Sequence, residues 1–496
     1  MKTLAVNSVA SRRHRACGPV SLTACVLSWA MGLGLFGCAL HKPPTHTAIV
    51  EQALPNATPL PPAWSTTPSA VKVDDDWLKS FHDSGLETVV NEALANNLDL
   101  RQAAARVQVA RLNVVVVGSK LKPQFNAPVA GATTHSSDAN GTEQNESSTV
   151  LIEAAWEIDV WGRLRSQRAA SQENYEAVAL DFAFARQSLA ATTAKSWYLA
   201  IETRQLLALT VQSVEVYQRL LALVKIRRAA GKVSNLDVAE ASYQLAEAEG
   251  QLTVAQGLYS EARRTLEVLI GHFPTAEFQV ADEFAPLPVP VAPGLPSSLL
   301  ERRPDVLASE HQVLAAFRTQ QAAKLALLPS FSLNMEGGRL SDPLFSVLGL
   351  NPWLIHSALG MMLPIYEGGA LRAQVKIATV EQVQSVAKFG SVSLRAFAEV
   401  EDALTNEQQL AKHLPSSEGA VRDHTEAVRI ANARYKSGSM DLLSVLQLQE
   451  GQIESQAQLI ELRNAQLANN IDLHLAVGGS FDSSPANFSG TQNHQP

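Results

Sequence analysis

The sequence predicts an α+β membrane protein with four strands per chain. Three copies would build a 12-stranded transmembrane β-barrel that continues into a long α-helical coiled-coil barrel. Three observations predict this fold: the chain is an internal duplication, each half contains long helical stretches with few breakers, and each half contains short stretches of apolar–polar alternation. Aromatic residues are only 6% of the 496 residues, which favours an extended helical protein over one compact domain.

The N-terminal segment has the features of an export signal. The basic stretch Arg12–Arg15 precedes an apolar run, Val20–Phe36, which ends just before Cys38. We therefore expect residues 1–37 to be a signal peptide and Cys38 to carry a covalent lipid. In the bacterial lipoproteins that this segment resembles, a residue other than Asp after the cysteine, here Ala39, implies sorting to the outer membrane. An ordinary signal peptide with an incidental cysteine is the alternative.

Composition disfavours several other classes of protein. Cys17 and Cys25 lie before the expected cleavage point, so the mature chain would have no cysteine pair and no disulfide. The formal net charge of −8 disfavours a nucleic-acid partner. Apart from the lipid on Cys38, no cofactor is expected, because the mature chain lacks metal-ligand spacing and a phosphate-binding glycine motif.

Comparing the chain with itself reveals two copies of one unit. Pro123-Gln124-Phe125 recurs as Pro329-Ser330-Phe331, and Arg227-x3-Gly231 recurs as Arg434-x3-Gly438, at nearly the same offset. We therefore expect these segments: a signal peptide at 1–37, a lipid-anchored extension at 38–83, a first repeat at 84–272, a Pro-rich linker at 273–296, a second repeat at 297–479 and a flexible C-terminal tail at 480–496.

Each repeat is expected to begin with a helix and continue with strands. Apolar residues at three- and four-residue spacing predict a helix over 86–121, which a proline then ends. The segment 131–148 is dense in Thr, Ser, Asn and Gly, which predicts turns. Strict alternation predicts a strand over 150–160, and alternation over 331–336 and 353–363 predicts its counterparts.

Long helices are expected to follow the strands. The segment 163–230 has almost no breakers, which predicts about 100 Å of helix at 1.5 Å per residue. Its counterpart is 370–436, in which Pro415 is expected to kink or break the helix. Shorter return helices are expected over 234–270, 297–328 and 439–477.

The alternating segments indicate how the chain could cross a membrane. The mature chain has no run of about 20 apolar residues for a spanning helix, whereas tilted strands of about 10 residues suffice. Glu153, Glu157 and Asp159 gather on one strand face, as a watery lumen allows. Open sheet edges are excluded in lipid, so several chains must share one barrel. Two copies would enclose only side chains, so a passage for solutes favours three. Half-buried strands of a soluble sandwich are the alternative.

Several motifs together resemble a known family. They are Trp156–Arg165 (WEIDVWGRLR), Leu300–Val306 (LERRPDV), Glu399–Leu404 (EVEDAL) and Arg434-Tyr435-x2-Gly438. In this order they resemble the TolC/OprM family of outer-membrane efflux channels, in its lipid-anchored NodT-like branch. The resemblance implies a homotrimer in the outer membrane with a helical tunnel in the periplasm. It also implies passive export of small molecules such as drugs, with a periplasmic adaptor and an inner-membrane pump of the resistance-nodulation-division type as partners.

The resemblance places a periplasmic gate at the tips of two helical hairpins, here 230–237 and 437–444. Relatives hold their tips closed by a tyrosine–aspartate hydrogen bond, and Tyr435 and Asp237 match that pair. The alternative is that Asp237 only serves the first turn of its own helix. The turn glycines are expected to adopt φ > 0. An adaptor would contact the following tip residues: Gly231, Lys232, Ser234, Lys436, Gly438 and Ser439.

The innermost constriction departs from the family pattern. Leu443 matches a hydrophobic ring residue of the branch. Ser444 and Gln447 stand where many relatives carry carboxylates, so an acidic, cation-selective ring is not expected here. We expect a constriction closed by apolar contact and neutral hydrogen bonds.

Two other classes of protein fit less well. An enzyme is disfavoured because the mature chain lacks the motifs of zinc proteases, phosphate-binding loops and serine hydrolases. The carboxylates Glu399, Glu401 and Asp402 are expected to be solvated. A non-conducting coiled-coil structural lipoprotein would explain the helices and the anchor, but neither the paired strands nor the duplication.

Overall fold

The computed structural model describes residues 42–54, 63–65, 75–138, 141–288, 291, 293–294, 296–341 and 353–480. The predicted signal peptide, the predicted lipid site Cys38 and the predicted tail after residue 480 lie outside these residues. The chain divides into two compact units. A sheet unit contains the strands and adjoining helix ends, Gly118–Gln167 and Thr319–Val375, and a helical unit contains Pro43–Val117, Arg168–Arg318 and the chain from Lys376 onward.

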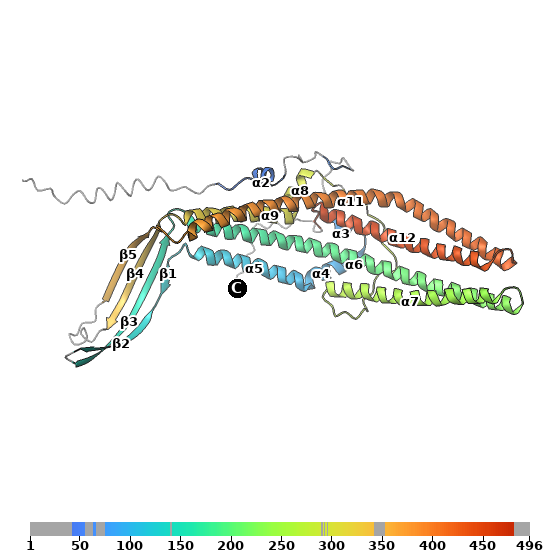
Figure 1. The fold of residues 1–496 in the computed structure, drawn as a ribbon, viewed down its shortest axis with the longest axis horizontal. Helices are drawn as coiled ribbons and strands as arrows, with labels where there is room; N and C mark the ends of the chain where they lie inside the picture. The colour runs from blue at the N-terminus through green and yellow to red at the C-terminus, as the bar shows by residue number, and fades with distance from the viewer. Residues whose placement is uncertain are drawn as a thin grey trace, which may run out of the picture. The chain divides into compact units, whose positions relative to one another are not determined.

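The strands form one antiparallel sheet (Figure 1). The central strand β3 (Gly141–Ile158) pairs with β4 (Ser330–Ser341), and β5 (Trp353–Met362) pairs with the far side of β4. β1 (Gln124–Asn126) and β2 (Val129–Asp138) pair with successive stretches of the other edge of β3. In the described part of the chain, the sheet therefore has four strand positions and two edges.

The prediction of turns over 131–148 is wrong. Most of this segment is a β-hairpin, in which β2 runs antiparallel to the first half of β3 and Asp138 lies opposite Gly141. Thr is β-branched and favours strands, and the Thr and Ser residues here fill ladder positions. Turn-prone composition therefore hid a hairpin.

The register gives the sheet one apolar and one polar face. Residues directly opposite one another share a face, and Ala154 lies between Phe125 and Met335 in one such row. Large apolar side chains of this face are exposed in the single chain: Phe125, Val129, Val150, Ile152, Met335, Ile355, Leu359 and Met361. A row on the opposite face consists of Asn126, Glu153, Glu336 and His356. The predicted alternation is confirmed.

The helices are α2 (His46–Ala53), α3 (Trp77–Ser80), α4 (Ser84–Asn96), α5 (Leu98–Ser119), α6 (Arg163–Ala229), α7 (Asn235–Leu269), α8 (Pro296–Arg302), α9 (Pro304–Leu325), α11 (Ala370–Ser437) and α12 (Leu442–Ala476). In the helical unit, α6 with α7 and α11 with α12 form two antiparallel hairpins (Figure 1). The predicted bounds of these four helices are confirmed to within a few residues.

Two predicted helices are each interrupted once. The helix predicted over 86–121 divides at Asn97, whose amide oxygen accepts from the Leu100 N–H at 3.0 Å. The Asn97 amide nitrogen donates to the Leu269 carbonyl at 3.1 Å, so the interruption also ties this segment to the end of α7. The helix predicted over 297–328 divides at Arg303, because Pro304 has no N–H and suits only the first turn of a helix.

Of the kink or break predicted at Pro415, the break does not occur. α11 continues from Ala370 to Ser437 with Pro415 inside it. An internal proline removes one backbone donor and costs about 3 kcal/mol. Pro415 lies on the exposed side of the helix in the single chain, where water can hydrogen-bond the carbonyl that it leaves without a donor.

Apolar side chains gather in three clusters in the helical unit. One joins α3, α4, α6, α7 and α12, and another joins α2, α8, α9, α11 and α12. The third, the tip cluster, joins the two hairpins near their turns and consists of Val214, Tyr217, Leu220, Leu221, Val224, Ala241, Ala248, Ala431, Tyr435, Leu442, Val445 and Leu446.

In the described part of the chain, α6 alone is long and apolar enough to cross a membrane by length and composition, and 33% of that stretch is buried.

Two family motifs meet at a buried arginine. Arg303 of LERRPDV is 3% exposed and pairs with Asp305 at 2.8 Å and with Glu399 of EVEDAL at 2.6 Å. Nearby, Glu401 accepts from the Ser65 N–H at 2.9 Å. The expectation that Glu399 and Glu401 are only solvated is therefore wrong. Because the guanidinium is buried, losing a carboxylate partner would leave a buried charge uncompensated, so the two motifs stabilise the fold.

The short helix α2 packs closely against other helices of the helical unit. Ile49 is buried in a cluster that contains Phe389, and His46 Nδ1 lies 2.8 Å from Glu310 Oε2. At Gly390, a Cβ atom would lie 2.6 Å from the Ala53 carbonyl oxygen, so only glycine permits this approach. The chain after the predicted lipid site is therefore fixed to α9 and α11.

Glu267 is a buried carboxylate that organises the start of the linker. Its oxygens accept from the backbone N–H groups of Ala276 and Glu277 at 2.8 Å and of Phe278 at 3.0 Å. Burial raises the pKa of this carboxyl, but the three donors outweigh burial and hold the pKa below its usual value.

Replacing Glu267 with Gln should lower the free energy of unfolding by about 1–3 kcal/mol, because an amide is a weaker acceptor for buried N–H donors. Since folding lowers this pKa, the carboxylate stabilises fully at neutral pH and loses its effect as the pH falls through its folded-state pKa. Thermal melts of detergent-purified wild type and Glu267→Gln should therefore differ at pH 7 and converge in acid. The exposed Glu277→Gln is the control, and an equal loss there would contradict the assignment.

Candidate functional site

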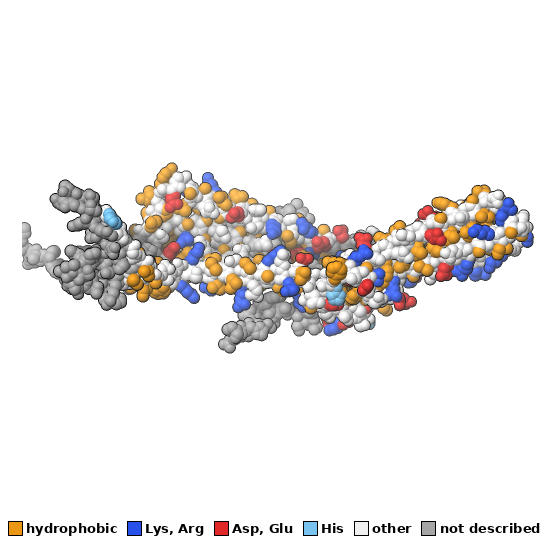
Figure 2. Space-filling view, turned by 90° about the horizontal axis from the view of Figure 1, so that it is seen from below, with side chains coloured by type: hydrophobic (Ala, Val, Ile, Leu, Met, Phe, Trp, Pro, Cys, Tyr) orange, Lys and Arg blue, Asp and Glu red, His pale blue; other side chains and the backbone are white. Residues whose placement is uncertain are grey.

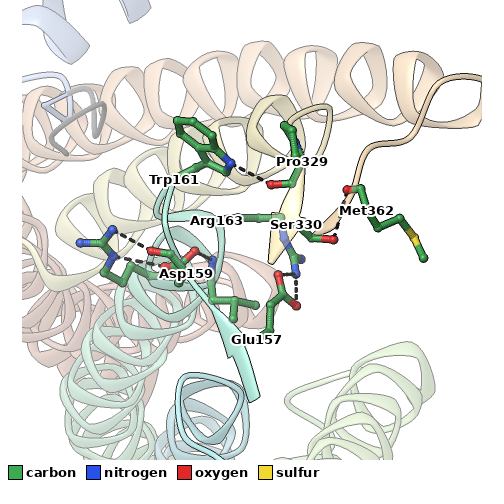
Figure 3. Close-up of polar contacts among 9 residues, drawn as sticks. Glu157, Asp159, Trp161, Arg163, Pro329, Ser330 and Met362 are labelled. Atoms are coloured by element: carbon green, nitrogen blue, oxygen red, sulfur yellow. Dashed lines mark hydrogen bonds and ion pairs between the residues drawn. The ribbon is translucent and has the colours of Figure 1, made fainter. Parts of the chain in front are cut away.

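The turn between β3 and α6 is held by Asp159 (Figure 3). Its carboxylate accepts from the backbone N–H groups of Leu164 at 3.0 Å and Arg165 at 2.9 Å, which have no partner inside the helix. The Arg165 side chain reaches back to the same carboxylate at 3.2 Å. A negative charge at the first turn also interacts favourably with the helix dipole. Asp159 therefore caps the first turn of α6.

Two further contacts hold this junction. Nη2 of Arg163 donates to both oxygens of Glu157 at 2.7 and 2.8 Å, and the Trp161 indole N–H donates to the Pro329 carbonyl at 2.8 Å (Figure 3). Pro329 directly precedes β4, so the signature WEIDVWGRLR joins the strands of both repeats at one end. These contacts give the signature a structural role.

The two hairpin tips have the same turn. Gly231 has φ +72° and Gly438 has φ +83°, which confirms the expected positive φ. In the first tip, Lys232 N donates to Arg227 O at 2.9 Å, and in the second, Ser439 N donates to Arg434 O at 2.9 Å. Both are Schellman motifs, in which a left-handed glycine lets the last carbonyls of a helix find donors.

The helices after the two turns begin with the same pair of residue types in opposite order. In α7, Ser234 is the N-cap and Asp237 stands three residues later, and each side chain accepts from the other's backbone N–H. In α12, Asp441 is the N-cap and Ser444 stands three residues later, with the Ser444 N–H donating to Asp441 at 2.8 Å. Each tip therefore has one capping carboxylate, placed one turn apart in the two repeats.

The caps lower the pKa of both carboxylates. Hydrogen bonding from the Ser234 side chain lowers the pKa of Asp237, and hydrogen bonding from the Ser444 backbone N–H lowers the pKa of Asp441. Asp441 was not among the predicted site residues, although its place before an apolar run matches an N-cap and could have identified it.

Tyr435 and Asp237 form no hydrogen bond with each other within the described chain. The Tyr435 side chain is 2% exposed in the tip cluster, and its hydroxyl has no hydrogen-bond partner among the described residues. Burial raises the pKa of this phenol. Asp237 is engaged in its helix cap, which is the alternative considered from sequence. A bond between Tyr435 and Asp237 of different copies stays a prediction.

The other predicted site residues lie at or near the surface of the tips. Leu443 is 53% exposed and Gln447 is exposed, whereas Ser444 is partly covered by its bond to Asp441. Residues predicted to contact an adaptor are all exposed: Gly231, Lys232, Ser234, Lys436, Gly438 and Ser439. Figure 2 shows Lys and Arg side chains gathered at this end of the hairpins.

The family of the chain follows from comparison with known proteins. The profile described as outer membrane efflux protein matches residues 89–272 and again 295–479, which together are most of the chain. The chain belongs to the outer membrane efflux protein family. Its relatives include the pyoverdine export outer membrane protein OpmQ of Pseudomonas putida, 29% identical over 91% of this chain and 96% of OpmQ. They also include the toluene efflux pump outer membrane protein TtgC of P. putida, 30% identical over 85% of this chain and 89% of TtgC. The cation efflux system protein CusC of Escherichia coli is 27% identical over 92% of this chain and 99% of CusC.

Solved structures give the same result. A membrane protein from Pseudomonas aeruginosa superposes with a TM-score of 0.77 at 28% identity, covering 89% of this chain and all of that one. CusC superposes with a TM-score of 0.75 at 25% identity, covering 89% of this chain and all of the CusC chain. The chain is therefore an outer-membrane efflux channel component, with a role in transport.

No cluster of His, Cys, Asp or Glu that could hold a metal ion occurs in the described part of the chain. That the protein needs no cofactor beyond a lipid on Cys38 stays a prediction.

Replacing Asp159 with Ala should lower the free energy of unfolding by about 1–2 kcal/mol, because two N–H groups of α6 lose their acceptor. Asp159→Asn should restore part of this loss, since its amide oxygen still accepts. Thermal unfolding of the detergent-purified variants, monitored by circular dichroism, measures both effects. If Ala and Asn behave alike, the carboxylate does not act as a cap.

Proposed function

We propose that three copies of this chain form one channel through the outer membrane, through which small molecules leave passively. Each chain would contribute four strands to a 12-stranded barrel and two hairpins to a periplasmic tunnel. The lipid on Cys38 would anchor each chain. A periplasmic adaptor at the hairpin tips and an inner-membrane pump of the resistance-nodulation-division type would complete a tripartite system that exports drugs and other toxic compounds.

The observation that supports a barrel shared between copies is the sheet, which has two unpaired edges and an exposed apolar face among the described residues. In lipid, every backbone N–H and C=O must have a partner, so a free edge of β5 or of β1 and β2 is excluded. The apolar face, with Ile152 and Ile355 exposed, suits contact with hydrocarbon. The row with Glu153 and Glu336 suits a lumen. Pairing β5 of one copy with β1 and β2 of the next satisfies both edges.

Exposed apolar helix faces support the same assembly. Large side chains on α5 stand in solvent in the single chain, among them Leu112 (62%) and Val115 (65%). On α11, Val380 (67%) and Val383 (61%) do the same. Faces of this kind are covered in a stable protein, and neighbouring copies would cover them. A tunnel wall made of α-helices from three chains follows from this packing.

Native mass spectrometry of the detergent-extracted protein tests the proposal. Three copies, each carrying the mass of an acylated Cys38, are expected, together with ion-conducting pores in planar bilayers. A Cys38→Ser variant should lose the lipid mass and retain the trimer, because the edges and not the anchor drive assembly. A monomeric wild-type protein would contradict the shared barrel.

The gate proposal predicts weak selectivity between cations and anions, because Leu443, Ser444 and Gln447 carry no charge at the constriction. Replacing the exposed Gln447 with Glu should raise the ratio of cation to anion permeability several-fold, since like charges concentrate counter-ions in a narrow pore. Reversal potentials across a KCl gradient measure this ratio. Gln447→Asn is the neutral control, and a wild type that already excludes anions strongly would contradict the proposal.

A further inference from the structure

The two hairpins of one chain meet at their tips through the last turns of α6 and α11. Val224 of α6 and Ala431 and Tyr435 of α11 are buried together in the tip cluster. Both helices end within a few residues of this contact, at Ala229 and Ser437. A movement that separates the hairpins must therefore break contacts at these last turns.

Arg227 crosses from the first hairpin to the second at this point. Its Nη1 donates to the backbone carbonyl of Tyr435, and its guanidinium carbon lies 4.4 Å from the centroid of the Tyr435 ring. The same side chain approaches the second turn, because a Cβ atom at Gly438 would lie 3.8 Å from Arg227 Nη2. One cation therefore touches a backbone carbonyl, an aromatic face and a turn of the opposite hairpin.

The chemistry of these contacts favours binding. The last carbonyls of a helix form the negative end of the helix dipole, which attracts a cation. The Tyr435 carbonyl accepts from the Gly438 N–H at 3.0 Å and has a second lone pair for Arg227. A guanidinium is planar, so it can lie against the aromatic ring while donating from its edge. Tyr435 contributes its ring and its carbonyl. Its hydroxyl is buried without a partner among the described residues, so the phenol O–H carries none of the contact within the chain.

We propose that Arg227 is the residue that holds the two hairpin tips of one chain together in the closed channel, and that its release from Tyr435 accompanies opening. This inference rests on the proposed function, because it assigns Arg227 a positioning role in the gate. It differs from the tyrosine–aspartate pair predicted from the family resemblance, since the bond is made by a guanidinium to a backbone carbonyl and a ring. Asp237 stays in its helix cap.

The variants Arg227→Ala, Arg227→Lys and Tyr435→Phe test this role in the full-length protein. Arg227→Ala should raise the open population roughly tenfold, given the loss of a charge-assisted hydrogen bond and a cation–π contact. Arg227→Lys should fall between, because a lysine keeps the charge but not the planar fork. Tyr435→Phe keeps the ring and the carbonyl, so its effect should be much smaller than that of Arg227→Ala. Open probability in planar bilayers measures all of them.

Arg228→Ala is the matched control. Arg228 is the next residue on α6, is exposed, and its Nε donates to Asn235 of its own hairpin at 2.7 Å. It should therefore leave the open population unchanged. Wild-type open probability in Arg227→Ala, or equal opening in Tyr435→Phe and Arg227→Ala, would overturn the inference.

A second measurement separates this inference from the channel function itself. Spin labels on Ala229→Cys and Ala433→Cys, both exposed at the ends of α6 and α11, report the distance between the tips in detergent. The distance distribution should broaden and lengthen in Arg227→Ala and not in Arg228→Ala. A lengthened distance in a protein that neither conducts nor restores drug resistance to a channel-deleted strain would refute the proposed function and support the role of Arg227 in holding the tips together. An unchanged distance in a protein that conducts would refute the role of Arg227 alone.

Discussion

Pairing of backbone N–H and C=O groups is the constraint on which the rest of this structure depends. The four strand positions leave two rows of such groups open in one chain. Water can satisfy an open edge and lipid cannot. Such a sheet would be stable in lipid only if another copy paired with its edges. The same need appears at smaller scale throughout the helices, where Asn97, Asp159, Ser234 and Asp441 each supply an acceptor for a helix start.

Features set by local pattern could be predicted from the sequence. The faces of β3 and β4 follow from alternation, and the bounds of α7 and α12 follow from helical periodicity between breakers. The positive φ of Gly231 and Gly438 follows from the turn that two stacked helices require. Composition used alone failed at β2, where Thr and Ser suggested turns but form a ladder. Pro415, expected to kink or break its helix, does not break it. The bonds of the candidate site could not be predicted from the sequence, because the contact of Arg227 with Tyr435 joins residues far apart in the chain.

The duplication explains why the two tips are alike without being identical. Both have the same glycine turn and one capping carboxylate, but the carboxylate and its serine partner exchange positions between α7 and α12. Arg227 reaches the opposite hairpin, whereas Arg434, its counterpart in the second repeat, is exposed. A ring of such hairpins would have contacts of two kinds, one within a chain and another between chains. Opening of the tunnel would then break one kind of contact and leave the other intact.

The packing of α2 limits how far the helices can lie from the membrane surface. Ile49 and the close approach of Ala53 to Gly390 fix this helix on α9 and α11. Only eight residues lead from Cys38 to His46, so a fully extended chain could span no more than about 28 Å. If a lipid holds Cys38 in the inner leaflet of the outer membrane, Glu310, which contacts His46, cannot lie much deeper in the periplasm than that. The length of this segment would then limit the depth of the helices in the periplasm, independently of any contact that the hairpin tips make.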